Sequence, residues 1–132
     1  MGLSISYHPV RDLPRLSWLA SLNLKTFADL SVFHGSSVEC RDTWIIEGVW
    51  DGDFSLGNFH KAENVFGSGI RIDAERVYFV SSSALVDHLF CCIHGERLLA
   101  SNSLIVLLGY TGATLDDTHD YYNESTSIIK GI

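Results

Sequence analysis

Short apolar runs separated by polar turns recur along the 132-residue chain and predict a mainly β structure. Brief runs rich in β-branched and aromatic residues are typical of strands. We expect strands at residues 4–7, 44–50, 67–72, 77–80, 89–93 and 97–100. The last four of these should form two hairpins, because a short polar turn joins each pair. In the first strand, Leu3, Ile5 and Tyr7 should share one face.

Two helices are expected beside these strands. Residues 16–24 have a weak amphipathic period, which favours a helix. Residues 104–108 are apolar and follow Ser101, Asn102 and Ser103, residue types that cap helix starts. Gly109 is expected to end this second helix. Residues 1–42 otherwise show little regular pattern.

The chain is long enough for one domain, residues 1–132, and 46% of it is hydrophobic, which can supply a core. Strands with a few helices indicate the α+β class. Residues 128–132 are typical of the start of a further strand. We therefore expect the chain to be the N-terminal part of a longer polypeptide.

The net charge of −7 argues against nucleic acid or an anionic membrane as the main partner, because both need a basic surface. The three cysteines, Cys40, Cys91 and Cys92, make an odd count that favours a reducing, cytoplasmic location. Residues 1–6 fit the loose pattern for myristoylation. No basic cluster supports an anchor there, so the strand interpretation is preferred.

A block of elements resembles the late part of the glutaminase-type domain, a class II glutamine amidotransferase domain, of asparagine synthetase-like proteins. The block runs from the strand at 77–80 through the apolar hairpin at 89–100 to the helix at 104–108. Gly52-Asp53-Phe54 is similar to a segment that precedes it in the family. Asp120-Tyr121-Tyr122 and residues 128–131 resemble the linker that follows it. The resemblance covers residues 43–132, whereas residues 1–42 diverge.

The resemblance implies an N-terminal-nucleophile-hydrolase-like sandwich, in which mostly antiparallel sheets stack between helical layers. A full family member continues into a synthetase domain that uses ATP and Mg²⁺ to form an amide. This chain departs from the family where glutamine is hydrolysed. Gly2 stands where the family has its nucleophilic cysteine. The chain has Ser81-Ser82-Ser83 where the family shows an Arg-Asp-Arg stretch, and the family's glutamine-binding segments have no counterpart. No catalytic, cofactor-binding or metal-binding residue is therefore carried over.

Three functional hypotheses follow. The first is a non-catalytic glutaminase-like domain of an asparagine synthetase-like protein, a carbon–nitrogen ligase, in contact with a synthetase domain in cis or in trans. The second is a stand-alone, β-rich protein-interaction module. The third is a small metal-dependent enzyme. The sequence leaves self-association and the acceptor substrate open.

Two clusters carry candidate chemistry of their own. Cys40 lies beside Arg41, which could lower the pKa of its thiol, but the sequence gives no reason to place His34 beside it as a base. An ordinary half-buried cysteine is therefore the preferred interpretation. His88, Cys92 and His94 should lie on one strand face at a spacing that zinc ligands can use. They offer three of the four ligands of a closed zinc site, and a packed, buried Cys92 is the preferred interpretation.

Other polar motifs have simpler explanations. Asp51-Gly52-Asp53 could hold a metal-bound nucleotide but is favoured as a tight turn. Gly67-Ser68-Gly69 is too short to cradle a phosphate and precedes a strand. The acidic positions near the end lack the periodicity of a calcium loop and predict a solvated stretch, with two tyrosines available for a domain contact. These positions are Asp116, Asp117, Asp120 and Glu124, beside Tyr121 and Tyr122.

Overall fold

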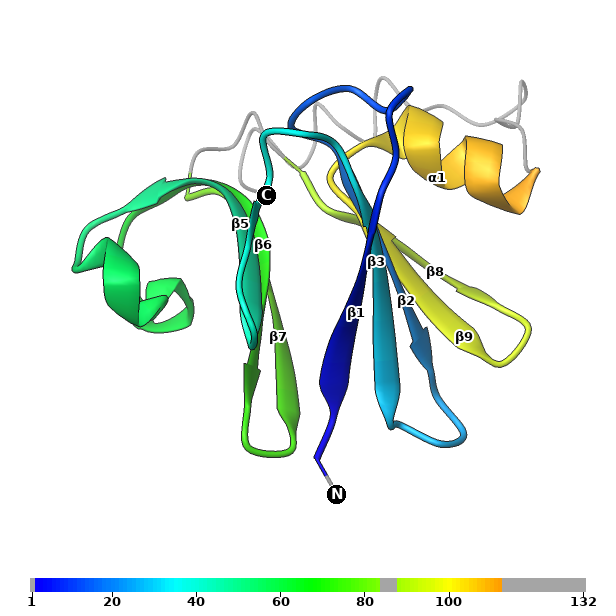
Figure 1. Cartoon of the computed structure of the whole chain (residues 1–132), viewed down its shortest axis with the longest axis horizontal. Coiled ribbons are helices and arrows are strands. Elements are labelled where there is room, and N and C mark those ends of the chain that lie inside the picture. Colours follow the sequence, from blue (N-terminus) through cyan, green and yellow to red (C-terminus); the bar gives the residue numbers. More distant parts are fainter. Residues whose placement is uncertain (1, 84–87, 113–132) are drawn as a thin grey trace, which may run out of the picture.

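Two β-sheets face each other in the computed structural model, which describes residues 2–83 and 88–112 (Figure 1). The five-stranded sheet has the order β1-β3-β2-β9-β8 and the four-stranded sheet the order β4-β5-β6-β7. The first contains β1 (Ser4–Pro9), β2 (Trp18–Asn23), β3 (Asp29–His34), β8 (Phe90–His94) and β9 (Arg97–Ser101). The second contains β4 (Glu39–Cys40), β5 (Trp44–Trp50), β6 (Val65–Asp73) and β7 (Arg76–Val80).

Neighbouring strands run antiparallel, except that β1 and β3 run parallel. The main core fills the space between the sheets, because every second residue of a strand points to the same face. The five-stranded sheet contributes mainly through β2, β3 and β9, and the four-stranded sheet through β5 and β6. The buried residues of this core are Trp18, Ala20, Leu22, Leu30, Val32, Val38, Ile45, Ile70, Ile72 and Ala100.

Each sheet also has a covered outer face. The helix α1 (Leu104–Thr111) packs on the five-stranded sheet, where Leu107 meets Leu19 and Leu99 (Figure 1). On the other side, the 3-10 helices η1 (Phe54–Leu56) and η2 (Phe59–Lys61) lie in the long connection between β5 and β6. The buried Phe59 covers Trp44 of the four-stranded sheet. The molecule is therefore layered, with short helical segments outside two stacked sheets.

Most of the predicted strands are confirmed, including the two hairpins β6–β7 and β8–β9. Leu3, Ile5 and Tyr7 do face the core together. The predicted helix at 16–24 is wrong, because β2 occupies this segment as a central strand between β3 and β9. Trp18 to Leu22 are buried without interruption, and such a strand loses the apolar–polar alternation that distinguishes it from a buried helix. The strand β3 was not predicted.

The end of α1 also differs from the prediction. Ser103 caps its start by accepting a hydrogen bond from the Val106 N–H at 3.3 Å, as expected. The helix continues past Gly109 and ends at Gly112, whose φ of 73° is left-handed and whose N–H donates to the Leu108 carbonyl. A glycine continues a helix wherever the surrounding hydrogen bonds and packing hold it, and Gly112 supplies the left-handed C-terminal position instead.

The expected class is confirmed at the level of a mostly β fold with two stacked sheets and short helices. No helix within residues 2–83 and 88–112 is long and apolar enough to cross a membrane. The predicted strand at 128–132, the acidic stretch with its tyrosines, and the first residue of the myristoylation pattern lie outside the described residues.

Candidate functional site

A polar pocket of about 140 Å³ lies between the ends of the two sheets. Glu47 of β5 and Ser68 of β6 come from the four-stranded sheet, and Asn102 follows the last strand of the other sheet. The remaining lining residues are Ser81, Ser82 and His88. Ser81 and Ser82 follow the end of β7, and Asn102 follows the end of β9. These two strand ends lie at the opposite end of the sandwich from the start of β1 (Figure 1).

A chain of hydrogen bonds forms the base of this pocket. The indole N–H of Trp18 donates to Ser68 Oγ at 3.1 Å, and the Ser68 hydroxyl donates to Glu47 Oε1 at 2.5 Å. Trp18 is fully buried and Ser68 is 3% exposed. Because the serine oxygen already accepts from the indole, its hydrogen points to the carboxylate, and the chain fixes the position of Glu47 from below.

Asn102 ties the pocket to the start of β2. Its Oδ1 accepts from the Trp18 backbone N–H at 2.9 Å, and its Nδ2 donates to the Leu16 carbonyl at 2.8 Å. The neighbouring Ser101 hydroxyl donates to the Trp18 carbonyl at 2.6 Å. Asn102 therefore uses its amide to hold the pocket wall in place, since both of its polar atoms bond to the backbone.

The open side of the pocket is formed by exposed polar residues. His88 and Ser81 are exposed, and the His88 ring meets the edge of Phe90 with centroids 6.3 Å apart. The Ser82 hydroxyl donates to the Val65 carbonyl at 3.2 Å, which fastens the chain after β7 to the start of β6. The pocket thus has a fixed, buried base carrying a carboxylate and an accessible rim of hydroxyls and an imidazole.

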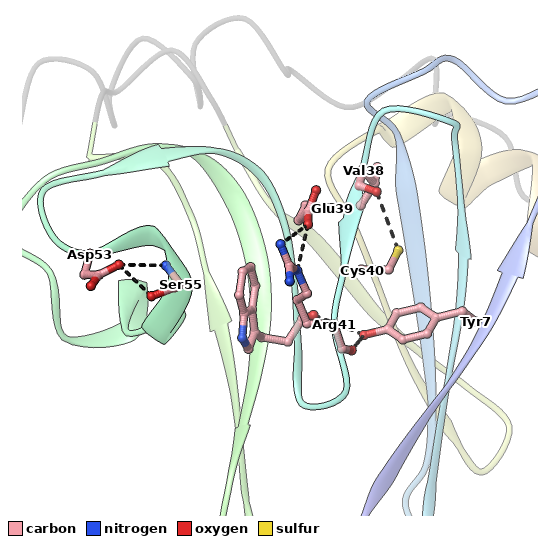
Figure 2. Close-up of polar contacts among 8 residues, drawn as sticks. Tyr7, Val38, Glu39, Cys40, Arg41, Asp53 and Ser55 are labelled. Carbon is pink, nitrogen blue, oxygen red and sulfur yellow. Dashed lines mark hydrogen bonds and ion pairs between the residues drawn. The ribbon is translucent and has the colours of Figure 1, made fainter.

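The thiol of Cys40 has the opposite pKa shift from the one that an activating Arg41 would cause. Burial, and then the negative charge of Glu39, raise the pKa of Cys40 to about 11. Arg41 does not offset these effects, because its guanidinium pairs with Glu39 at 2.6 Å and lies over the Trp44 ring (Figure 2). The alternative of a thiol activated by Arg41 is not supported, and the preferred interpretation of Cys40 as an ordinary half-buried cysteine is confirmed.

The surroundings of Cys40 explain its role in packing. Its Sγ donates a weak hydrogen bond to the Val38 carbonyl at 3.6 Å (Figure 2). The nearby Tyr7 hydroxyl donates to the backbone carbonyls of Arg41 and Trp44, and burial raises the pKa of this phenol. The imidazole ring of His34 contacts the phenol ring of Tyr7 edge-on, so the residue that His34 lies beside is Tyr7. A thiol held mostly protonated is a poor nucleophile.

The zinc hypothesis is not supported by the positions of its residues. Across residues 2–83 and 88–112, no group of three or more His, Cys, Asp or Glu side chains is placed to hold a metal. Cys92 packs into the apolar cluster beneath α1, whereas His94 is exposed at the end of β8 and His88 lies before that strand. All three cysteines are free, and Cys91 is exposed on the strand next to Cys92.

The Asp51-Gly52-Asp53 motif serves the local backbone. Asp53 accepts hydrogen bonds from the Ser55 N–H and hydroxyl at 3.0 and 2.7 Å, which begins η1 and lowers the pKa of the aspartate (Figure 2). Asp51 accepts from the Asn64 N–H and from its side-chain amide, both at 3.2 Å. The turn interpretation is confirmed.

The glycines of Gly67-Ser68-Gly69 allow β5 and β6 to approach closely. A Cβ on Gly67 would lie 1.9 Å from the Glu47 carbonyl oxygen, and a Cβ on Gly69 would lie 2.3 Å from the Ile45 oxygen. Gly67 pairs with Gly48, and both have positive φ values that favour glycine. The motif is therefore part of a strand, as expected, and places Ser68 opposite Glu47.

An apolar groove of about 510 Å³ runs between α1 and the connection from β1 to β2. Its lining includes Ile105 and Tyr110 of α1, Phe33 of β3 and Leu13 of the connection. Ile105 is 82% exposed and Tyr110 is 50% exposed, so the groove continues onto an uncovered apolar surface. We call this surface the α1 groove.

Sequence reasoning assigned no role in a site to the residues at the base of the polar pocket. Glu47 was part of a predicted strand, Ser68 of a glycine motif and Asn102 of a helix cap. One signal could have identified Glu47, because it is the only charged residue within the otherwise apolar run 44–50. The partnership with Ser68 depends on the register of β5 and β6, which the sequence does not state.

Comparison with protein-family models, curated proteins and solved structures gave no match.

Proposed function

We propose that this chain is a non-catalytic, glutaminase-like domain of an asparagine synthetase-like, ATP-dependent amide-forming protein. The stacking of two sheets beneath outer helical segments supports the resemblance read from residues 43–132. The observation that carries the non-catalytic part is the start of β1. Gly2 precedes this strand and has no side chain that could attack an amide.

The cysteines support the same conclusion. Burial raises the pKa of the Cys40 thiol to about 11, so it is not activated as a thiolate at neutral pH. Cys92 is packed beneath α1. The domain would act by binding, and the α1 groove is the surface suited to a protein contact.

The synthetase-like domain is the proposed occupant of the α1 groove. Gly109 and Tyr110, near the C-terminal end of α1, line this groove, and a domain in cis would contact the exposed apolar side chains there. A domain supplied in trans would use the same exposed apolar side chains. ATP and Mg²⁺ would belong to that domain.

A stand-alone β-rich interaction module is the second candidate. The exposed apolar side chains on and near α1, Ile105, Tyr110 and Leu16, support it equally well, because they suit any apolar partner. The two candidates differ in the identity of the partner and in whether a synthetase-like domain is encoded with the chain.

Two experiments test the proposal. Purified chain incubated with glutamine should release no ammonia above a buffer blank; release proportional to protein concentration would contradict the non-catalytic role. Binding to a co-expressed synthetase-like domain should then be measured by titration calorimetry. Ile105→Asp should weaken it at least tenfold, whereas Ile93→Asp should leave it unchanged, since Ile93 is 70% exposed on β8 and does not line the α1 groove. Full-strength binding by Ile105→Asp would place the contact elsewhere.

A further inference from the structure

The polar pocket between the sheets has the chemistry of a binding site for a small organic cation. Among the described residues that line it, Glu47 is the only one formally charged at neutral pH. The other lining groups are hydroxyls, an amide and an imidazole. A carboxylate surrounded by neutral hydrogen-bonding groups favours a positively charged ligand with N–H donors.

The carboxylate is held in place before any ligand arrives. Ser68 and Trp18 fix Glu47 Oε1 through the buried hydrogen-bond chain. Within the described part of the chain, the structure gives Glu47 Oε2 no hydrogen-bond partner. A preorganised acceptor loses little conformational entropy on binding, so one oxygen of Glu47 is prepared to accept from a ligand.

The size of the pocket limits the ligand. Its volume of about 140 Å³ is close to the roughly 150 Å³ of an engineered cavity that holds benzene, so the ligand has on the order of six non-hydrogen atoms. Exposed Ser81 and His88 at the rim leave a route from solvent. The Ser81 hydroxyl can accept from an ammonium group and can also donate to a ligand hydroxyl, and Ser82, which donates to the Val65 carbonyl, can accept.

We propose that this pocket binds a small primary ammonium compound, with the ammonium on Glu47 and a polar substituent toward the serines at the rim. The inference rests on the pocket alone and holds whether or not the chain is a glutaminase-like domain. Binding is non-covalent and needs no further reactant. Ethanolammonium, which carries both groups and fits the volume, is the probe.

The indole N–H of Trp18 reports on this site in nitrogen–proton correlation spectra. It donates to Ser68, which donates to Glu47, so a cation on Glu47 changes its chemical shift. The indole N–H of Trp50 lies in the aromatic cluster with Phe54 and Phe59, away from the pocket, and serves as the internal control. Titration of ethanolammonium chloride into the wild-type chain should shift the Trp18 signal with saturation and leave the Trp50 signal in place.

Variants and a second cation separate the site from general charge attraction. Glu47→Gln should weaken binding at least tenfold, whereas Glu75→Gln, in the turn between β6 and β7, should not change it. Tetramethylammonium has the same charge but no N–H donor and should give no saturable shift. The proposal is overturned if the wild-type Trp18 signal does not saturate, if Glu47→Gln binds as tightly as the wild type, or if tetramethylammonium binds equally. Should Glu47→Gln fail to fold, the wild-type comparison of the two cations decides the matter.

Discussion

Removal of the buried indole N–H of Trp18 should destabilise the fold and reveal how strongly the two sheets are joined at the polar pocket. Trp18 belongs to the five-stranded sheet and Ser68 to the four-stranded sheet, so their 3.1 Å hydrogen bond crosses the core. Trp18→Phe removes this donor and leaves Ser68 Oγ, in a side chain that is 3% exposed, with one partner fewer. It also removes part of a side chain that is fully buried.

The expected cost has two parts. A buried polar atom that loses its partner costs about 1–3 kcal/mol, and the smaller ring leaves unfilled space that costs about 1–2 kcal/mol more. The free energy of unfolding of Trp18→Phe should therefore fall by about 2–5 kcal/mol. Ser68→Ala should cost about 1–3 kcal/mol, because it leaves the indole N–H buried without an acceptor.

Equilibrium urea unfolding followed by far-ultraviolet circular dichroism measures these values. The double variant should be less destabilised than the sum of the single variants, by about 1–2 kcal/mol, because both remove the same bond. Trp44→Phe combined with Ser68→Ala is the control and should be additive, since Trp44 lies in the separate cluster with Phe59. Additivity of Trp18→Phe and Ser68→Ala within about 0.3 kcal/mol would refute the reasoning, because the bond would then contribute nothing.

Four further predictions follow from individual residues. Gly67→Ala should lower the free energy of unfolding by about 3 kcal/mol or more, because the added Cβ would lie 1.9 Å from the Glu47 carbonyl oxygen and φ is 119°. Gly2→Ala is the control: it has open space around it and should change stability by less than about 0.5 kcal/mol in the same urea unfolding experiment. In a variant that retains Cys40 as its only cysteine, a disulfide reagent at neutral pH should react with the thiol of the folded chain roughly 100-fold more slowly than with the thiol of the unfolded chain, because burial raises the pKa to about 11. Equal rates would contradict the burial argument. Burial, and then the positive charges of Arg71 and Lys61, lower the pKa of His60 and outweigh the opposite effect of Asp73, so the unfolded chain binds this proton more tightly than the folded chain. The contribution of the neutral His60 to stability should be complete above the unfolded pKa and should fall as pH drops through the folded pKa. His60→Gln should flatten that part of the stability–pH curve. Ser103→Ala should lower stability by about 1 kcal/mol through loss of the helix cap, and a Ser103→Asp variant should retain most of it.

The predictions from sequence succeeded where a short polar turn separates two apolar runs, whereas β3 was missed although its burial alternates along the strand. The hairpin β6–β7 follows from two apolar runs around the turn at Asp73 and Arg76. The segment at 18–22 failed because a central strand buried on both faces carries no alternation. The family resemblance and its functional consequences remain predictions, to be tested by the glutaminase and binding assays.

The polar pocket was beyond sequence reasoning for a different reason. Glu47 and Ser68 are 21 positions apart and become neighbours only through the register of β5 and β6. Trp18 is 50 positions from Ser68 and reaches it only because the two sheets stack. Cys40 shows the same limit, because the burial that raises the pKa of its thiol is decided by the fold.

The sequence by itself determined the mostly β character of this chain, its hairpins and the start of its helix. Those features depend on contacts between residues close in the chain, or on the identity of a single residue. Only the tertiary structure decided which sheet each strand joined, how the thiol of Cys40 is protonated, and that one carboxylate lies in a small pocket. Burial, desolvation and long-range pairing set those properties, and each of them depends on residues brought together from distant parts of the chain.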